Sequence, residues 1–183
     1  MKRKLIFGFI VAFALITVQE AFFSKDAPAS TWNSEVQVNR ISTSTPALVT
    51  RVVDGDTIIA LINGVSERVR LIGVDTPETV DPRKLVQCFS KEASAFTATL
   101  LQDKTVRLEF DPSQSNRDKY GRLLRYVFLT DGTLMDKLLI TEGYGYEYTY
   151  DTPYKYQSEF KQAQASAKEL KKGLWADGVC VKQ

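Results

Sequence analysis

Histidine is absent from this sequence of 183 residues, and its absence excludes several classes of enzyme. A Ser-His-Asp triad, a Cys-His hydrolase site, a histidine-ligated zinc centre and the histidine acid–base pair of a ribonuclease are all impossible. Acid–base chemistry must therefore use carboxylates, lysine, tyrosine or metal-bound water. Two cysteines are too few for a thiolate zinc site or a disulfide-rich miniprotein. The remaining composition, 44% hydrophobic and 25% charged, is typical of a soluble globular domain.

The N-terminal segment has the arrangement of a secretory signal. Three basic residues at positions 2–4 precede an apolar run at 5–18, and 14 residues are fewer than the roughly 20 that span a membrane. An A-x-A cleavage site follows at 27–29. We interpret residues 1–29 as a signal peptide, with an uncleaved anchor as the alternative. The protein is then expected to be exported and either secreted or tethered to the cell surface.

The rest of the chain divides into a linker and one domain. Residues 30–47 are rich in serine, threonine, alanine, proline and asparagine without a sustained period, which predicts a disordered linker. Residues 48–183 form a single domain without an evident internal repeat. Residues 1–29 hold four of the 24 basic and two of the 22 acidic side chains, so the remainder carries 20 of each sign. Any recognition of phosphate must therefore be local.

Within the domain, strand signals come first and helix signals are interspersed later. β-branched runs bounded by turn residues predict five strands, at 47–53, 57–62, 68–72, 105–110 and 123–129. Capping residues and apolar spacing predict three helices, at 90–101 with Ser90 as the cap, at 133–142, and at 153–172 with Pro153 in first position. This order indicates an α+β domain that is mainly β barrel. We predict an OB-fold five-stranded antiparallel barrel with three packed helices.

Two acidic residues are predicted to meet at one end of this barrel. Asp56 belongs to the turn VDGDT at 53–57, and a hairpin brings the end of the next strand, with Asp75, back toward it. Converging carboxylates are costly unless a cation lies between them, and hard oxygen ligands suit Ca²⁺ or Mg²⁺. As isolated patterns, however, VDGDT and the basic segment at 118–122 are better explained as ordinary turns.

Taken together, six strings make the chain resemble the staphylococcal nuclease (thermonuclease) family over residues 48–175. They are VDGDT at 53–57, RLIGVDTPET at 70–79, EASAFT at 92–97, DKYGR at 118–122, GTLMDKLLITEGYG at 132–145 and KGLW at 172–175. The separation of Thr57 from Arg70 also agrees with the family's spacing. The resemblance implies a calcium-dependent nuclease that attacks the 5′ side of the phosphate and leaves 3′-phosphate ends.

The resemblance also implies three metal ligands and three catalytic residues. Hydrolysis of a phosphodiester builds negative charge on phosphorus, and two arginines with Ca²⁺ can offset that charge without histidine. A glutamate would accept or orient the proton of the attacking water. The implied metal ligands are Asp56, Asp75 and the backbone carbonyl of Thr76, and the implied catalytic residues are Arg70, Arg122 and Glu78.

Four more residues would bind the nucleotide. The resemblance implies that Lys119 and Tyr120 hold a terminal phosphate and that Tyr148 and Tyr150 line the pocket, although residues 143–156, with six tyrosines, depart from the family's usual sequence. External water as the nucleophile makes a 2′-hydroxyl unnecessary, so both DNA and RNA are expected substrates, preferably single-stranded or frayed. No protein partner is implied, and we expect a monomer. The alternatives are a non-catalytic OB-type nucleic-acid-binding module and a structural cell-surface domain.

The two cysteines suit an exported chain. Cys88 and Cys180 could form a disulfide, with two free thiols as the alternative. In the chain-entropy model, a bond that closes a loop of this length stabilises the fold by about 4–5 kcal/mol at most. Neither cysteine lies in the stretches that carry the implied chemistry. Catalysis is therefore expected to survive reduction.

Overall fold

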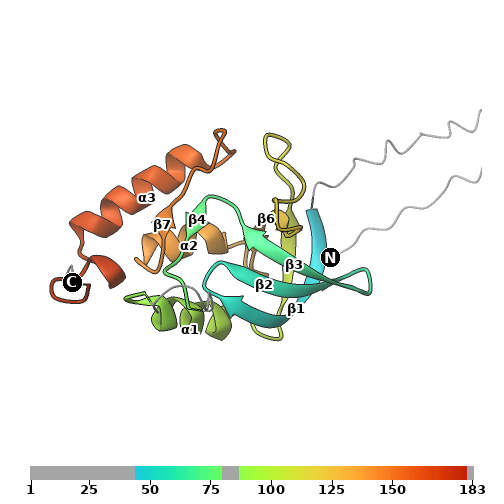
Figure 1. The fold of residues 1–183 in the computed structure, drawn as a ribbon, viewed down its shortest axis with the longest axis horizontal. Helices are drawn as coiled ribbons and strands as arrows, with labels where there is room; N and C mark the ends of the chain where they lie inside the picture. Colours follow the sequence, from blue (N-terminus) through green and yellow to red (C-terminus); the bar gives the residue numbers. More distant parts are fainter. Residues whose placement is uncertain (1–43, 80–86, 181–183) are drawn as a thin grey trace, which may run out of the picture. The chain divides into compact units, whose positions relative to one another are not determined.

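Within residues 44–79 and 87–180, which a computed structural model describes, five β-strands close into a barrel and three α-helices pack around it (Figure 1). The barrel order is β1-β2-β3-β6-β5, and β4 pairs with β7 in a separate small sheet. The strands are β1 (Ser44–Asp54), β2 (Thr57–Ile62), β3 (Val65–Leu71), β4 (Val74–Asp75), β5 (Thr105–Glu109), β6 (Leu123–Phe128) and β7 (Tyr146–Glu147). The helices are α1 (Ser90–Leu101), α2 (Met135–Thr141) and α3 (Gln157–Glu169), followed by the 3₁₀ helix η1 (Gly173–Trp175).

The barrel is mixed, which corrects the prediction of a purely antiparallel one. β3 and β6 pair in parallel, with Val69 opposite Leu123, whereas the other four neighbouring pairs of the ring are antiparallel. The reason is the number of strands. Direction cannot alternate all the way around a closed ring of five, so one neighbouring pair must be parallel. The α+β class, the OB-type barrel and the three helices are confirmed.

The first strand and the first helix begin differently from the prediction. β1 starts at Ser44, because residues 44–48 pair with β5, so the end of the expected linker belongs to the barrel. Ser90 is the first residue of α1 and not its cap, since Phe89 precedes it with a left-handed φ of 67° and no side-chain cap bond forms. The expected signal, residues 1–29, lies outside the described residues. Within the described part of the chain, no helix is long and apolar enough to cross a membrane.

The last helix starts at Gln157, four residues after the predicted Pro153. The residues before it make contacts with the barrel instead of helical bonds. The backbone N–H of Lys155 donates to Asp111 Oδ2 at 2.8 Å, and the buried hydroxyl of Tyr126 donates to the same oxygen at 2.7 Å. Because one carboxylate joins β6 to this segment, the tertiary contact overrides the local helix signal.

A buried carboxyl joins α2 to the barrel. Asp136 is fully buried, and its Oδ2 accepts a hydrogen bond from the backbone N–H of Val127 in β6 at 2.9 Å. Burial raises the pKa of Asp136 well above its ordinary value, although bonds from backbone N–H groups and the charge of Arg70 oppose that shift. The carboxyl is therefore neutral in the folded protein at pH values where it is ionised in the unfolded chain.

Asp136→Asn should remove a pH dependence of stability. Because the folded pKa is raised, unfolding releases a proton, so the free energy of unfolding falls as the pH rises from about 4 toward the folded pKa. Asparagine keeps an oxygen for Val127 but does not titrate. Relative to wild type, the variant should therefore gain stability as the pH rises, by up to about 1.4 kcal/mol per pH unit. Urea unfolding at pH 5 and pH 8 measures this, and a difference that does not change with pH would contradict it.

Candidate active site

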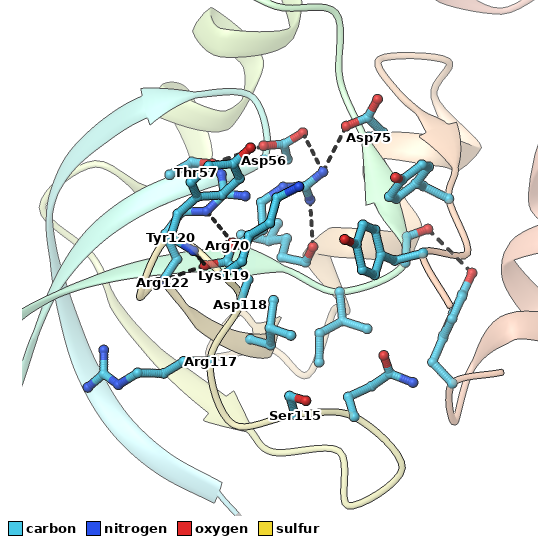
Figure 2. Close-up of a pocket in the computed structure, with 18 of the residues that line it drawn as sticks. Asp56, Thr57, Arg70, Asp75, Ser115, Arg117, Asp118, Lys119, Tyr120 and Arg122 are labelled. Carbon is cyan, nitrogen blue, oxygen red and sulfur yellow. Dashed lines mark hydrogen bonds and ion pairs between the residues drawn. The ribbon is translucent and has the colours of Figure 1, made fainter. Parts of the chain in front are cut away.

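An open cleft of about 1100 Å³ lies at one end of the barrel (Figure 2). Its walls come from four segments: residues 53–57 at the β1–β2 turn, 68–78 from β3 through β4, 113–124 before and into β6, and 148–154 after β7. All ten residues to which the sequence resemblance gives a catalytic, metal-binding or substrate-binding role line it. They are Asp56, Arg70, Asp75, Thr76, Glu78, Lys119, Tyr120, Arg122, Tyr148 and Tyr150.

Arg70 lies between two carboxylates at the end of β3 (Figure 2). Its Nη2 is 2.8 Å from Asp75 Oδ1 and 3.2 Å from Asp56 Oδ2, and its Nη1 donates to the backbone carbonyls of Leu71 and Val74. The side chains of Arg70 and Asp56 are 11% and 7% exposed, whereas that of Asp75 is 52% exposed. The guanidinium is thus fixed on one side by carbonyls and faces both carboxylates with the other.

Asp56 is held in place by two threonines. Its Oδ2 accepts bonds from the backbone N–H and the hydroxyl of Thr76 at 2.8 and 3.1 Å, and its Oδ1 accepts one from the hydroxyl of Thr57 at 3.0 Å. Gly55 allows Thr76 to lie this close to the turn, because a Cβ at position 55 would lie 2.7 Å from Thr76 Oγ1. The turn therefore requires glycine between its two aspartates.

Asp54 is a site residue that the sequence reasoning did not single out. It is buried, and its Oδ1 accepts a bond from the backbone N–H of Asp56 at 3.2 Å. Burial, together with the charges of Asp56 and Glu78, raises the pKa of Asp54 to about 7. Asp54 thus lies buried close to two other acidic residues of the cleft, Asp56 and Glu78. The signal was present in the sequence, since the same DGD turn contains both aspartates.

Asp118 fixes Arg122 in the turn before β6. Asp118 Oδ2 accepts a bond from Arg122 Nε at 2.6 Å, and Oδ1 accepts bonds from the backbone N–H groups of Tyr120 and Arg122, both at 2.9 Å. Partial burial works to raise the pKa of Asp118, but the bonds from Arg122 outweigh it and lower the pKa. Arg122 Nη1 points toward the hydroxyl of Thr57, 3.4 Å away. Asp118, the first residue of the DKYGR turn, therefore holds the backbone of the turn and the side chain of Arg122 in place.

Aromatic rings and one lysine line the mouth of the cleft. Tyr148 and Tyr150 are 43% and 72% exposed, and their ring centroids are 6.4 Å apart. Lys119 Nζ lies 5.2 Å from the ring centroid of Tyr120, and the pKa of Lys119 is raised by Tyr120 and Tyr150. The 118–122 turn and the tyrosines after β7 therefore approach one another. Arg68, exposed on β3, also lines the cleft and makes no ion pair with a described residue.

The carboxylate oxygens that converge on Arg70 are ligands of the kind that a hard cation binds. Asp56 and Asp75 both direct a carboxylate oxygen at one positively charged group, which shows that their positions allow them to share a charge. Two carboxylates with backbone carbonyls and water form a common ligand set for Ca²⁺. Among the described residues, no group of three or more acidic, cysteine or histidine side chains is close enough to hold a metal ion.

The cysteines lie apart from the lining of the cleft. Cys88 and Cys180 form a disulfide with their Cα atoms 5.8 Å apart. Next to this bond, Gln87 makes two hydrogen bonds to the backbone of Glu78. The disulfide is the one that the sequence suggested, whereas no local pattern could have indicated the bonds between Gln87 and Glu78, since Gln87 belongs to none of the quoted strings.

The chain is similar to known proteins over most of its length. Residues 68–177 match the family model described as staphylococcal nuclease homologue. The chain is 40% identical over 171 residues to thermonuclease of Staphylococcus hyicus, covering 92% of this chain and 95% of that protein. It is also 40% identical to thermonuclease of Staphylococcus intermedius over 166 residues, covering 91% and 94%. Endonuclease YncB of Bacillus subtilis is 39% identical over 127 residues, covering 69% of this chain and 59% of YncB.

Arg70→Met should destabilise the fold because it leaves two carboxylates without their cation. The expected loss is about 3 kcal/mol, the lower end of the range for a buried pair, since Asp75 is half exposed. Arg117→Met is the matched control, because its pair with Glu67 is more exposed and should contribute little to stability. Urea unfolding in a metal chelator compares the two variants. Equal losses would contradict the buried role of Arg70.

Proposed function

The chain belongs to the staphylococcal nuclease family and is a nuclease, and from this premise we propose that it uses calcium to hydrolyse phosphodiester bonds in DNA and RNA. One observation carries the proposal. Asp56, Arg70 and Asp75 converge on one another in the cleft, and Arg122 reaches Thr57, the cross-strand partner of Arg70. Fixed cations and carboxylates are the groups that phosphodiester hydrolysis needs when no histidine is present.

The two arginines would offset the charge that builds on the phosphate. Arg70 Nη1 is anchored by the carbonyls of Leu71 and Val74, so Nη2 can exchange its bond with Asp75 for one with a phosphate while the group stays in place. Arg122 is anchored at Nε by Asp118, and its Nη1 makes only a long bond of 3.4 Å to Thr57, which it can exchange for one with the substrate. Donors that are already oriented stabilise the transition state without the cost of reorganisation.

Calcium is the metal that these donors favour. Asp56 and Asp75 would hold it with the backbone carbonyl of Thr76, because hard oxygen donors in an irregular set suit this ion. When bound, calcium would supply a further positive charge and Lewis-acid stabilisation of the phosphate oxygens. Of the two carboxylates, Asp56 is already ordered by the hydroxyl of Thr57 and by Thr76.

Glu78 is the residue that we assign to the attacking water. It lines the same cleft as both arginines, and a glutamate can accept a proton from water or orient it. Attack by external water does not use the 2′-hydroxyl of the substrate, which is why both DNA and RNA should be cleaved. Attack from the 5′ side of the phosphate, as the family resemblance implies, would leave 3′-phosphate ends.

The mouth of the cleft would bind the nucleotide. Lys119 and Tyr120 would hold a terminal phosphate, and Arg68 offers one more cation beside them. Tyr148 and Tyr150 expose ring faces on which any base can stack, which favours single-stranded or frayed substrates and gives little sequence preference.

We also propose that the protein is exported and then secreted or tethered to the cell surface. The basic segment at 2–4, the apolar run at 5–18 and the A-x-A site support export. The disulfide between Cys88 and Cys180 agrees with an oxidising compartment, where such bonds persist.

Arg122→Ala and Glu78→Gln should each lower kcat by about a hundredfold or more with a smaller change in KM, because both groups act on charge that develops during the reaction. Cleavage of single-stranded DNA by the wild type should require calcium and stop when a chelator is added.

Asp75→Ala should weaken calcium binding, measured by calorimetry, and remove nearly all cleavage.

Circular dichroism establishes that each of these variants is folded before rates are compared. Near-equal rates for wild type, Arg122→Ala and Glu78→Gln would reject the catalytic assignment. Binding of DNA without calcium-dependent cleavage would favour the alternative, a non-catalytic nucleic-acid-binding module.

Replacing both Tyr148 and Tyr150 by alanine should raise KM for single-stranded DNA by about tenfold or more, because each stacked base loses a ring face. The value of kcat should change less, since the rings are away from the phosphate. Tyr146→Ala is the matched control: Tyr146 is 38% exposed, but its ring packs against Trp175 and does not line the cleft. Steady-state kinetics on the same oligonucleotide compares them. An equal rise in KM for the control would contradict a stacking role.

A further inference from the structure

Glu78 is fixed through its backbone by one distant residue. The backbone N–H of Glu78 donates to Gln87 Oε1 at 2.9 Å, and the carbonyl of Glu78 accepts a bond from the backbone N–H of Gln87 at 3.1 Å. Both polar groups of the Glu78 backbone are therefore paired with the same partner. The direction in which the Glu78 side chain leaves the backbone depends on where Gln87 lies.

Gln87 is in turn fixed at the start of α1. Its carbonyl accepts the backbone N–H of Ser90, the first residue of the helix, at 3.2 Å. Cys88, its neighbour, is bonded to Cys180 in the C-terminal segment. The ring of Phe89 stacks on Tyr144 with the centroids 5.4 Å apart. Three consecutive residues thus attach this end of α1 to different parts of the domain.

The same helix holds the carboxylate turn. The buried hydroxyl of Thr97 donates to the carbonyl of Gly55, between Asp54 and Asp56, at 2.7 Å. One turn earlier on the same face of α1, Ser94 Oγ lies 3.3 Å from the Oγ1 of Thr79, the residue after Glu78. α1 therefore contacts both the segment that carries Glu78 and the turn that carries Asp56, in addition to the direct bonds between Thr76 and Asp56.

We propose that Gln87 is a positioning residue for Glu78 and that the Cys88–Cys180 disulfide keeps Gln87 in place. The proposal rests on the role of Glu78 in the proposed function. A dithiol would remove this restraint by reducing the disulfide. It gives two electrons and two protons, so the S–S bond breaks to leave two thiols and the dithiol becomes its own disulfide. Activity then survives reduction, but at a lower kcat.

Gln87→Met tests the positioning role, since methionine keeps the length of the side chain but offers no strong acceptor to the Glu78 N–H. Loss of one neutral hydrogen bond predicts a fall in kcat of about three- to tenfold, with KM and calcium affinity within twofold of wild type. Gln87→Glu restores an acceptor oxygen and should recover most of kcat. Gln102→Met is the matched control: Gln102 Oε1 accepts the backbone N–H of Val52 at 3.2 Å at the opposite end of α1.

The disulfide is tested in the full-length chain with Cys88→Ser/Cys180→Ser and, independently, by wild type in dithiothreitol. Each should lower kcat by about the same factor as Gln87→Met, because all three loosen the same contact. The variant that combines Gln87→Met with Cys88→Ser/Cys180→Ser should have a kcat no lower than that of the slower of the two separate variants. Independent losses of stability would instead add together. If Gln87→Met does not fold, reduced wild type still gives the comparison.

The outcomes separate the two proposals. If Glu78→Gln lowers kcat but Gln87→Met does not, the positioning role is wrong and the proposed function stands. If Glu78→Gln has full activity, the role of Glu78 in the proposed function fails. Equal loss of kcat in Gln87→Met and Gln102→Met, or no recovery in Gln87→Glu, would also overturn the positioning role.

Discussion

One guanidinium group connects the segments that form this active site. Arg70 bonds to Asp56 in the β1–β2 turn, to Asp75 in β4 and to two backbone carbonyls near the end of β3. Without a cation there, the carboxylates of Asp56 and Asp75 would repel one another, and the buried carboxyl of Asp54 lies close to Asp56. The main electrostatic constraint therefore lies where the barrel ends, and the other site residues are arranged around it.

Barrel closure brings the second arginine to the first. Because β3 and β6 run in parallel with Val69 opposite Leu123, Arg122 enters β6 beside the last part of β3. Thr57, toward which Arg122 points, is the cross-strand partner of Arg70. The pairing that an odd number of strands makes unavoidable is thus also the pairing that places two phosphate-binding candidates in one cleft.

The sequence predicts the parts of this structure that depend on neighbouring residues. Alternation and turn residues located the five barrel strands, short motifs located eight lining residues of the cleft, and the family resemblance added Tyr148 and Tyr150. What it missed depends on contacts between distant residues. β4 and β7 have two residues each and no period to detect, and α3 starts late because Asp111 holds Lys155. The bonds between Glu78 and Gln87 likewise follow from the fold and have no local signature.

The disulfide between Cys88 and Cys180 has a consequence for proteolysis. Asp56, Arg70 and Glu78 precede the loop of chain that the disulfide closes, whereas Lys119 and Arg122 lie within that loop. A protease that cuts one peptide bond between the two cysteines, for example in the exposed turn at 119–121, would leave both fragments covalently joined. The two halves of the site would then stay at a high effective concentration after such a cut, and the nicked chain could remain assembled.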